Sequence, residues 1–397
     1  MTNANAAPID VTAEIGRRIR RMRSVQELAQ SDLAQKAGLS TGMMSHIEQG
    51  RSTCPPEALG RIAKALDCAP EYLNATAWRV SPTRPWLRAY ADAPQKVLDR
   101  QLSDATNAAE VIDSLGLRRV PVTLPVFSGD LDDPQDIEDF AGHVRAVADI
   151  AEGAVVGNMI RFAERLGCVV LPMAGELGRH LGMSTRFDSL PVICVSRPSE
   201  VPDWHVPGDR QRMTVAHEVA HLVLHAGVAV PNRPEGAREI ERQAFRFGAA
   251  LLTPADAMYE EIEAIGGRVT LRALAEIKTR WGVAIKMLVG RFRDMGVISE
   301  DHARSLYKQI SARGWNKGEP VQVDNEEAIW LPRSLEETAE SGSLDQAVAR
   351  ASERTGLGAS HFQRWLDWTP TKGEEPAREA RVIPMRRRAG QEGQQSR

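Results

Sequence analysis

The chain has 397 residues, of which 42% are hydrophobic and 26% charged. At about 150 residues per domain this length predicts two or three domains, and the composition excludes wholesale disorder and fibrous proteins. Because the formal net charge is only −3, affinity for nucleic acid would require a local basic patch.

Residues 1–13 are expected to be flexible, and they lack the basic and apolar segments of an export signal. The most apolar later stretch, residues 213–230, carries a glutamate and three histidines, so no membrane span is expected. Cys54, Cys68, Cys168 and Cys194 are far apart and form no CxxC pair, which argues against a disulfide framework and a cysteine-based zinc site. We therefore expect a cytoplasmic protein.

Residues 14–76 are expected to fold as an all-α domain, because apolar residues recur there with helical spacing and strand signals are nearly absent. Ile15, Ile19 and Met22 form one apolar stripe. The remaining surface of this helix is expected to be a basic patch of five arginines: Arg17, Arg18, Arg20, Arg21 and Arg23.

Residues 28–50, LAQSDLAQKAGLSTGMMSHIEQG, have the spacing of a helix-turn-helix. Gly38 permits the positive φ of the turn, and Ser40 is a good cap for the second helix. The side chains expected to point inward are Leu33, Met44 and Ile47. The residues then left facing outward are Thr41, Gly42, Ser45 and His46.

If the second helix enters a major groove, its outward residues meet base edges and neighbouring polar side chains touch phosphates. The candidate DNA-binding residues are Arg17, Arg20, Gln30, Ser40, Thr41, Gly42, Ser45, His46 and Arg51. A homodimer is expected, because half-sites of such domains usually occur in pairs. The alternative is a small helical interaction domain with a solvated arginine face.

From IGRRIRRMRS to ALGRIAKALDCAPEYL the domain resembles the XRE (phage-repressor) helix-turn-helix family along its whole length. The matching positions are Gln30, Leu33, Ala34, Ala37, Gly38, Ser40, Ser45, Ile47, Glu48, Gly50 and the LGRIAKAL helix. The resemblance implies that the partner is double-stranded operator DNA. Ala29 departs from a usual capping serine, and Gly42 removes one base-reading side chain.

Residues 77–136 are expected to form a helical linker, interrupted by proline-rich stretches. The next domain, residues 137–320, has an α+β pattern. Its predicted elements are helices 137–150 and 155–166, strands 168–172 and 191–196, and helices 210–225, 238–252, 270–280 and 284–295. Residues 321–368 are expected to be helical, mainly from 343, and the charged tail 369–397 to be disordered.

The predicted helix 210–225 contains MTVAHEVAHLVLH, an HExxH motif. His217 and His221 are four residues apart, so both imidazoles project from one helix face and can bind one Zn²⁺ ion. Glu218 lies one step round the helix, where it can act as the general base on a zinc-bound water. The helix is apolar nearly all round, and burying these polar groups without a ligand would be costly. The alternative is a chance match.

Such a site needs a third protein ligand. Glu241 is preferred, because on a helix it shares a stripe with Ala244 and Gly248, whose small side chains allow close packing on the HExxH helix. His225 is the rival, but three histidines along one straight helix cannot all reach one ion. We therefore expect His225 to support the site or the fold.

Residues 137–320 resemble the ImmA/IrrE metallopeptidase family. The resemblance rests on PVICVS, RQRMTVAHEVAHLVLH, the block from Glu241 to LLTP, WGVAIKMLVGRFRDMGVIS and GWNKGEP. It implies that Glu241 completes the metal triad and that the substrate is a DNA-binding repressor. Gly248 stands where alanine is usual, and Gln243 where glutamate is common.

The sequence thus predicts a mainly helical α+β protein: an N-terminal helix-turn-helix bundle, a zincin-like metallopeptidase domain with a small sheet, and a helical C-terminal region. The predicted function is a DNA-binding transcriptional regulator that cleaves a partner repressor, or itself, with zinc. The alternatives are a non-catalytic ligand- or metal-sensing repressor and a toxin-antitoxin component. Residues 271–298 could be a second helix-turn-helix, although supporting hairpins are commoner. The cluster Arg386, Arg387 and Arg388 is expected to be solvated, with auxiliary DNA contact as the alternative.

Overall fold

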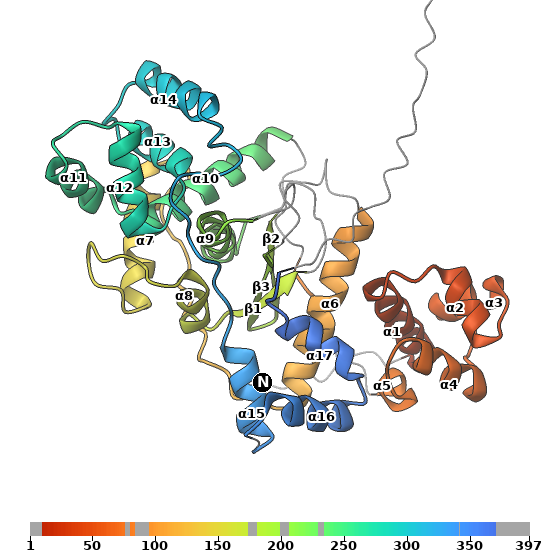
Figure 1. Cartoon of the computed structure of the whole chain (residues 1–397). Helices are drawn as coiled ribbons and strands as arrows, with labels where there is room; N and C mark the ends of the chain where they lie inside the picture. Colours follow the sequence, from red (N-terminus) through yellow and green to blue (C-terminus); the bar gives the residue numbers. More distant parts are fainter. Residues whose placement is uncertain are drawn as a thin grey trace, which may run out of the picture.

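The computed structural model describes residues 10–75, 80–83, 95–173, 181–198, 206–228, 234–340 and 342–370. Within these residues the protein is mainly helical and has one small sheet, so the predicted fold class is confirmed (Figure 1). Residues 1–9 of the expected flexible start, most of the proline-rich stretch 77–94, and residues 371–397 of the charged tail with its arginine cluster lie outside the described residues.

The N-terminal bundle has five helices. They are α1 (Val11–Val25), α2 (Gln30–Ala37), α3 (Thr41–Glu48), α4 (Pro56–Ala65) and α5 (Pro70–Asn74). The side chains predicted to point inward, Leu33, Met44 and Ile47, are at most 1% exposed. Gly38 ends α2 with φ 67°, and the Ser40 hydroxyl accepts a hydrogen bond of 3.1 Å from the backbone N–H of Met43 at the start of α3. The predicted helix-turn-helix is therefore present in detail.

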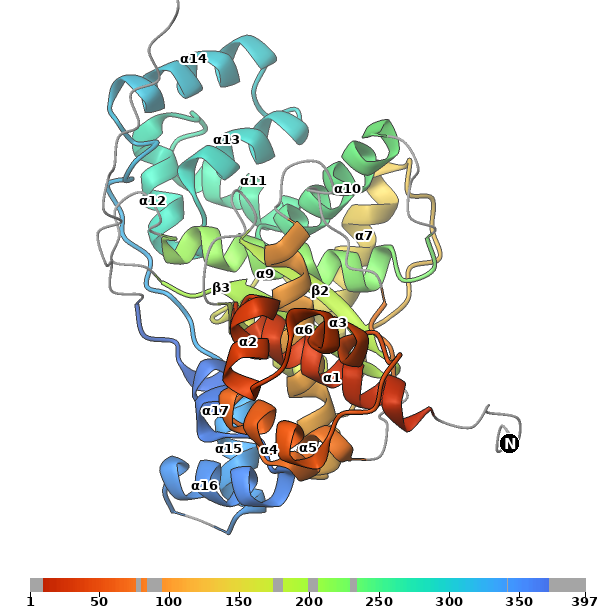
Figure 2. The ribbon, with the colours of Figure 1, turned by 90° about the vertical axis from the view of Figure 1, so that its right-hand side faces the viewer.

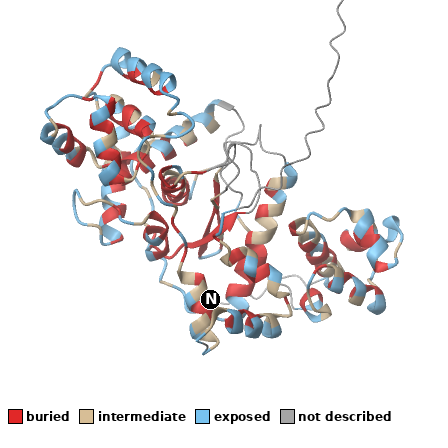
Figure 3. Cartoon of the chain, viewed as in Figure 1, coloured by how far each residue is buried: buried red, intermediate tan, exposed pale blue. Residues whose placement is uncertain are grey.

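The sheet contains β1 (Val169–Met173), β2 (Gly182–Phe187) and β3 (Leu190–Ser196) in the order β1-β3-β2. β1 runs parallel to β3, and β2 runs antiparallel to it. Alternate residues of the strands serve two hydrophobic cores: Val170 and Ile193 belong to one, Val169 and Val192 to the other. Because both faces are covered, β1 and β3 are continuous apolar runs (Figure 3).

The remaining helices are arranged around this sheet. They are α6 (Gln95–Ser114), α7 (Pro134–Val147), α8 (Met159–Arg165), α9 (Gly208–Leu224), α10 (Pro234–Leu252), α11 (Ala255–Ala264), α12 (Leu271–Trp281), α13 (Ile285–Asp294), α14 (Glu300–Ala312), α15 (Trp330–Thr338), α16 (Leu344–Thr355) and α17 (Ala359–Leu366). α9 packs against β2, β3 and α10, while α6 contacts β3 and α17 contacts β1. The HExxH helix therefore covers one face of the sheet, and α6 and α17 cover the other.

The N-terminal bundle is attached to the helices on the face opposite α9 (Figure 2). α1 packs along α6, and the loop after α4 meets the turn between α16 and α17. There the backbone N–H of Ala69 donates to Gly356 O at 2.6 Å, and that of Gly358 donates to Asp67 O at 2.8 Å. The bundle is thus fixed to the body by backbone hydrogen bonds and helix packing.

Three elements were not predicted: β2, α11 and α14. α15 lies within residues 321–368, which were expected to be helical. β2 reads GMSTRF, and its alternate residues Gly182, Ser184 and Arg186 are not apolar. These positions face α9, and with Thr185 between them only Met183 and Phe187 are left as apolar residues, too few for the strand to be recognised. The predicted stop of a helix at Gly282 is confirmed, with φ 64°.

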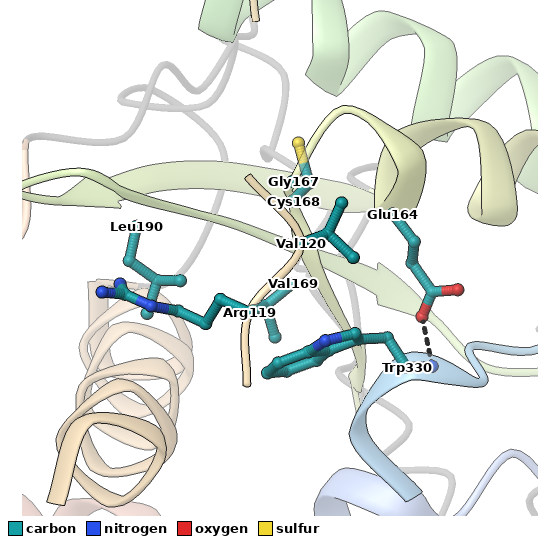
Figure 4. Close-up of a pocket in the computed structure, with 8 residues that line it drawn as sticks. All are labelled: Arg119, Val120, Glu164, Gly167, Cys168, Val169, Leu190 and Trp330. Atoms are coloured by element: carbon teal, nitrogen blue, oxygen red, sulfur yellow. Dashed lines mark hydrogen bonds between the residues drawn. The ribbon is translucent and has the colours of Figure 1, made fainter. Parts of the chain in front are cut away.

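A small cavity of about 10 Å³ lies where β1 meets α8 and the start of α15 (Figure 4). Glu164 lines it and accepts a hydrogen bond of 2.9 Å from the backbone N–H of Trp330, which anchors α15 to α8. This volume holds about one water molecule, so the cavity is a packing feature.

Among the described helices, none is long and apolar enough to cross a membrane.

Candidate metal centre and nucleic-acid interface

The two histidines of the HExxH motif project from the same side of α9. Five residues around them are fully buried: Val215, Ala216, Val219, Ala220 and Val223. These apolar contacts hold α9 between the sheet and α10. His217 Nε2 and His221 Nε2 lie 3.1 Å apart, as the four-residue spacing predicts.

Glu241 approaches the same point from α10. One carboxylate oxygen lies 3.3 Å from His217 Nε2, and the other lies 3.6 Å from His221 Nε2. One donor atom of each of the three residues can be chosen so that all lie within 4.8 Å of one another. Two imidazole nitrogens and one carboxylate oxygen form a donor set that catalytic zinc takes, with a fourth position left open.

Gly248 allows α10 to lie this close to α9. A Cβ atom built at Gly248 would lie 2.9 Å from Met213 Cε and 3.3 Å from the backbone nitrogen of His217. Since real Cβ atoms rarely approach so closely, a side chain there would require Met213 to move. The small residues on the Glu241 stripe thus have the packing role expected from the sequence.

Glu218 points from α9 toward β2, and it is 4% exposed. The Ser184 hydroxyl donates to Glu218 Oε2 at 2.7 Å. Gly182 makes room for this carboxylate, because a Cβ there would lie 3.1 Å from both Glu218 Cγ and Oε1. Burial raises the pKa of Glu218 to about 7. His217 and the Ser184 hydrogen bond act to lower this pKa, and the Glu241 carboxylate acts to raise it further.

Burial also lowers the pKa values of two histidines of α9. The pKa of His221 falls well below its usual value, with further contributions from His217 and His225, and that of His225 falls to about 4. Both imidazoles are therefore neutral near pH 7, which is the form that binds metal ions. His225 Nδ1 lies 3.0 Å from His221 Nδ1, on the nitrogen that does not face Glu241. His225, the alternative third ligand, thus contacts the proposed ligand His221 and is outside the donor cluster.

Two polar residues at this centre were not predicted to act there. Ser184 lies on the strand that the sequence pattern missed, so no signal pointed to it. Gln243 was noted only as a departure from the family pattern, and in the structure its Oε1 lies 3.2 Å from His225 Nε2. Its place on α10, two residues after Glu241, could have indicated a position near the histidines.

The second helix of the helix-turn-helix, α3, presents Thr41, Gly42 and His46 as exposed residues, while Ser45 is half-buried. The Gln49 side-chain amide donates to Ser45 Oγ at 3.1 Å. Arg17, Arg20 and Arg51 are exposed near this helix-turn-helix. The amide nitrogen of Gln30 donates to Glu48 at 2.8 Å, so this group is engaged within the bundle.

The predicted patch of five arginines is wrong for three of its members. Arg18 is 0% exposed, and with Arg21 it forms an ion pair with Glu110 of α6. Arg23 donates to both oxygens of Glu48, at 2.6 and 3.0 Å. These three arginines lie on faces of α1 that pack against α6, α3 or the loop after α1, where they pair with buried carboxylates and donate hydrogen bonds to carbonyl oxygens. Only Arg17 and Arg20 of the five are exposed to solvent.

Comparison with known families divides the chain in the same way. A family model described as an IrrE N-terminal-like domain matches residues 163–293, and one described as a helix-turn-helix domain matches residues 14–75. No curated protein sequence gives a match. The first match contains all three clustered donors, and the second contains α2 to α5 and α1 from residue 14 onward. The chain therefore combines a helix-turn-helix domain with a peptidase-like domain of the ImmA/IrrE type, as the resemblance in the sequence predicted.

Proposed function

We propose that this chain is a DNA-binding transcriptional regulator whose peptidase domain hydrolyses a peptide bond with zinc. The observation that carries the hydrolytic part is the convergence of His217, His221 and Glu241 from two helices, beside the buried carboxylate of Glu218. A helix with a chance HExxH pattern has no reason to meet a third donor. These three residues would hold the ion.

Zinc, when bound, supplies a Lewis acid that polarises a peptide carbonyl and activates water. Glu218 accepts the proton from that water and passes it to the leaving amine. Its raised pKa of about 7 matches this role, because a general base works best when its pKa is near the working pH. Ser184 positions the carboxylate by donating to Oε2, which leaves Oε1 to take the proton.

The proposed DNA contacts are made by the N-terminal bundle. Exposed residues of α3, among them Thr41 and His46, read base edges, and Arg17, Arg20 and Arg51 contact phosphates. The chain acts as a homodimer in the cytoplasm, since helix-turn-helix domains usually bind paired half-sites. With one chain carrying both activities, the proposed substrate is a partner repressor or a second copy of this chain.

The test compares full-length wild type with Glu218→Gln, which keeps the size of the side chain and an acceptor for Ser184. Zinc content is measured for both proteins, and each is incubated with candidate repressors and with a tagged copy of the chain. We expect equal zinc and cleavage by wild type only. Equal cleavage by both proteins, insensitive to a chelator, would exclude the proposed base. Zinc binding with no cleavage by either would favour the non-catalytic sensor.

A further inference from the structure

A chain of hydrogen bonds leads away from the proposed metal centre on the far side of His221. His225 ends α9 and is 0% exposed, and its Nδ1 lies 3.0 Å from His221 Nδ1. On the other side of the same ring, His225 Nε2 lies 3.2 Å from Oε1 of Gln243, which is 5% exposed on α10. Both ring nitrogens of His225 thus face protein groups.

The direction of these hydrogen bonds follows from the contacts of the Gln243 amide nitrogen. The Gln243 amide nitrogen donates to the backbone carbonyl of Leu131 at 3.1 Å and to Glu239 Oε1 at 3.3 Å. A backbone carbonyl can only accept a hydrogen bond, so the NH₂ group must point toward Leu131 and the amide oxygen toward His225. His225 therefore carries its proton on Nε2 and donates to Gln243.

The same logic fixes the tautomer of His221. With the proton of neutral His225 on Nε2, its Nδ1 is an acceptor. His221 must then carry its proton on Nδ1 and donate it to His225. Its Nε2 is then the acceptor nitrogen, on the side where His217 and Glu241 lie.

We propose that His225 and Gln243 are positioning residues of the metal centre, which hold His221 in the Nδ1–H tautomer with Nε2 directed at the ion. The inference rests on the proposed zinc site and assigns neither residue as a ligand. It also ties the centre to the segment before α7, because Leu131 O accepts the last hydrogen bond. Partners of this kind usually contribute a factor of about 10–100 to metal affinity.

One arm of the test needs no metal. In metal-free full-length protein labelled with ¹⁵N-histidine, long-range ¹H–¹⁵N spectra report the tautomer of each ring, assigned with single-histidine variants. We expect the Nδ1–H form for His221 and the Nε2–H form for His225, and a shift of the His221 tautomer balance in Gln243→Leu. An Nε2–H tautomer of His221 in the wild type would contradict the proposed hydrogen-bond chain from His221 through His225 to Gln243.

The second arm measures the zinc dissociation constant by competition with a chromogenic chelator. His225→Phe is expected to bind zinc about 10–100-fold more weakly than wild type, with Gln243→Leu weaker in the same direction. His302→Phe, which removes an exposed histidine from α14, is the matched control and should leave affinity unchanged. Wild-type affinity in His225→Phe would refute the positioning role. Failure of the wild type to bind zinc would refute the proposed metal centre. The tautomer spectra would still show whether His225 and Gln243 set the tautomer of His221.

Discussion

Arg18 of α1 and Glu110 of α6 form an ion pair buried between the helix-turn-helix bundle and the helix that lies on the sheet. Arg18 also donates to the carbonyls of Tyr72 at 2.9 Å and Ala75 at 2.8 Å, and Arg21 pairs with the second oxygen of Glu110. The Glu110 carboxylate thus bridges two arginines at the junction, and Glu14 Oε1 lies 3.5 Å from Arg18 Nε as a second carboxylate. The bundle is attached by charge pairing as well as by the backbone hydrogen bonds of the α16–α17 turn.

Glu110→Gln should loosen this junction. It removes the carboxylate that Arg18 and Arg21 share and leaves Arg18 with Glu14, 3.5 Å from its Nε. Breaking a buried ion pair by removing one partner typically costs about 3–5 kcal/mol. Hydrogen exchange measured by mass spectrometry should show α1 and α6 losing protection while α9 and α10 keep theirs. Asp99→Asn, which changes an exposed carboxylate of α6, is the control. Equal loss of protection in both helix pairs would show that Glu110 stabilises the whole fold and not the contact between α1 and α6 in particular.

Arg17→Glu with Arg20→Glu should weaken DNA binding for all sequences. Each arginine is exposed, and each phosphate contact contributes about one unit to the slope of log affinity against log salt. The slope of the double variant should therefore fall by about two. Arg272→Glu, at a 91% exposed side chain on α12, is the control. An unchanged slope in the double variant would remove these arginines from the DNA interface.

Changes at Thr41 or His46 should affect sequence preference, unlike the arginine changes. Base contacts determine which DNA sequence is bound, whereas phosphate contacts fix the position of the protein on the duplex. Thr41→Ala or His46→Ala should change which operators are preferred, with losses of about 1–3 kcal/mol on the preferred site and little effect on non-specific DNA. Selection of binding sites from a random DNA library measures this preference. If both variants select the same sites as wild type, α3 does not read bases through these residues.

Ser184→Ala should impair the proposed general base without removing metal. The lost hydrogen bond favours the charged form of Glu218, so the pKa of Glu218 should rise further above about 7. The ascending limb of kcat/KM against pH should move to higher pH in the variant, with zinc content unchanged. The assay uses a protein that wild type cleaves, and Ser184→Thr, which retains a hydroxyl, should recover part of the wild-type profile. An unmoved limb would contradict the role of Ser184.

Acidification should weaken the attachment of α17. His361 is 0% exposed and contacts Leu66 O at 3.1 Å, and its pKa is lowered mainly by burial and further by Arg364, while Asp104 and Asp67 oppose the shift. The unfolded chain therefore takes up a proton near pH 6.5 that the folded chain takes up only at lower pH. This stabilising contribution is present above about pH 6.5 and is lost as the pH falls below it.

The check is urea unfolding at about pH 7.5 and 5.5 for wild type and His361→Gln, which keeps an amide donor and does not titrate. The free energy of unfolding should fall less on acidification in the variant. His302→Gln, at an exposed histidine, should behave as wild type. An identical pH dependence of wild type and His361→Gln would show that His361 contributes nothing to it.

Sequence pattern was sufficient where local rules decide the structure. The helix-turn-helix followed from Gly38, Ser40 and the buried positions of α2 and α3, and the HExxH spacing placed His217 and His221 together. Arg18 could not be placed, because its burial depends on Glu110, which lies 92 residues away. β2 was missed because Gly182 and Ser184 serve the Glu218 carboxylate, which leaves Met183 and Phe187 as the only apolar residues of the strand.

The most direct test of the account is metal analysis of the full-length protein beside Glu241→Ala. Elemental analysis after zinc loading and exhaustive dialysis should find one zinc ion per wild-type chain, with nitrogen and oxygen ligands in its X-ray absorption spectrum. Glu241→Ala should lose the ion, while Glu235→Ala, at an exposed position of α10, should keep it. A wild-type chain that retains no zinc, or a Glu241→Ala chain that retains it fully, would contradict a centre built from His217, His221 and Glu241.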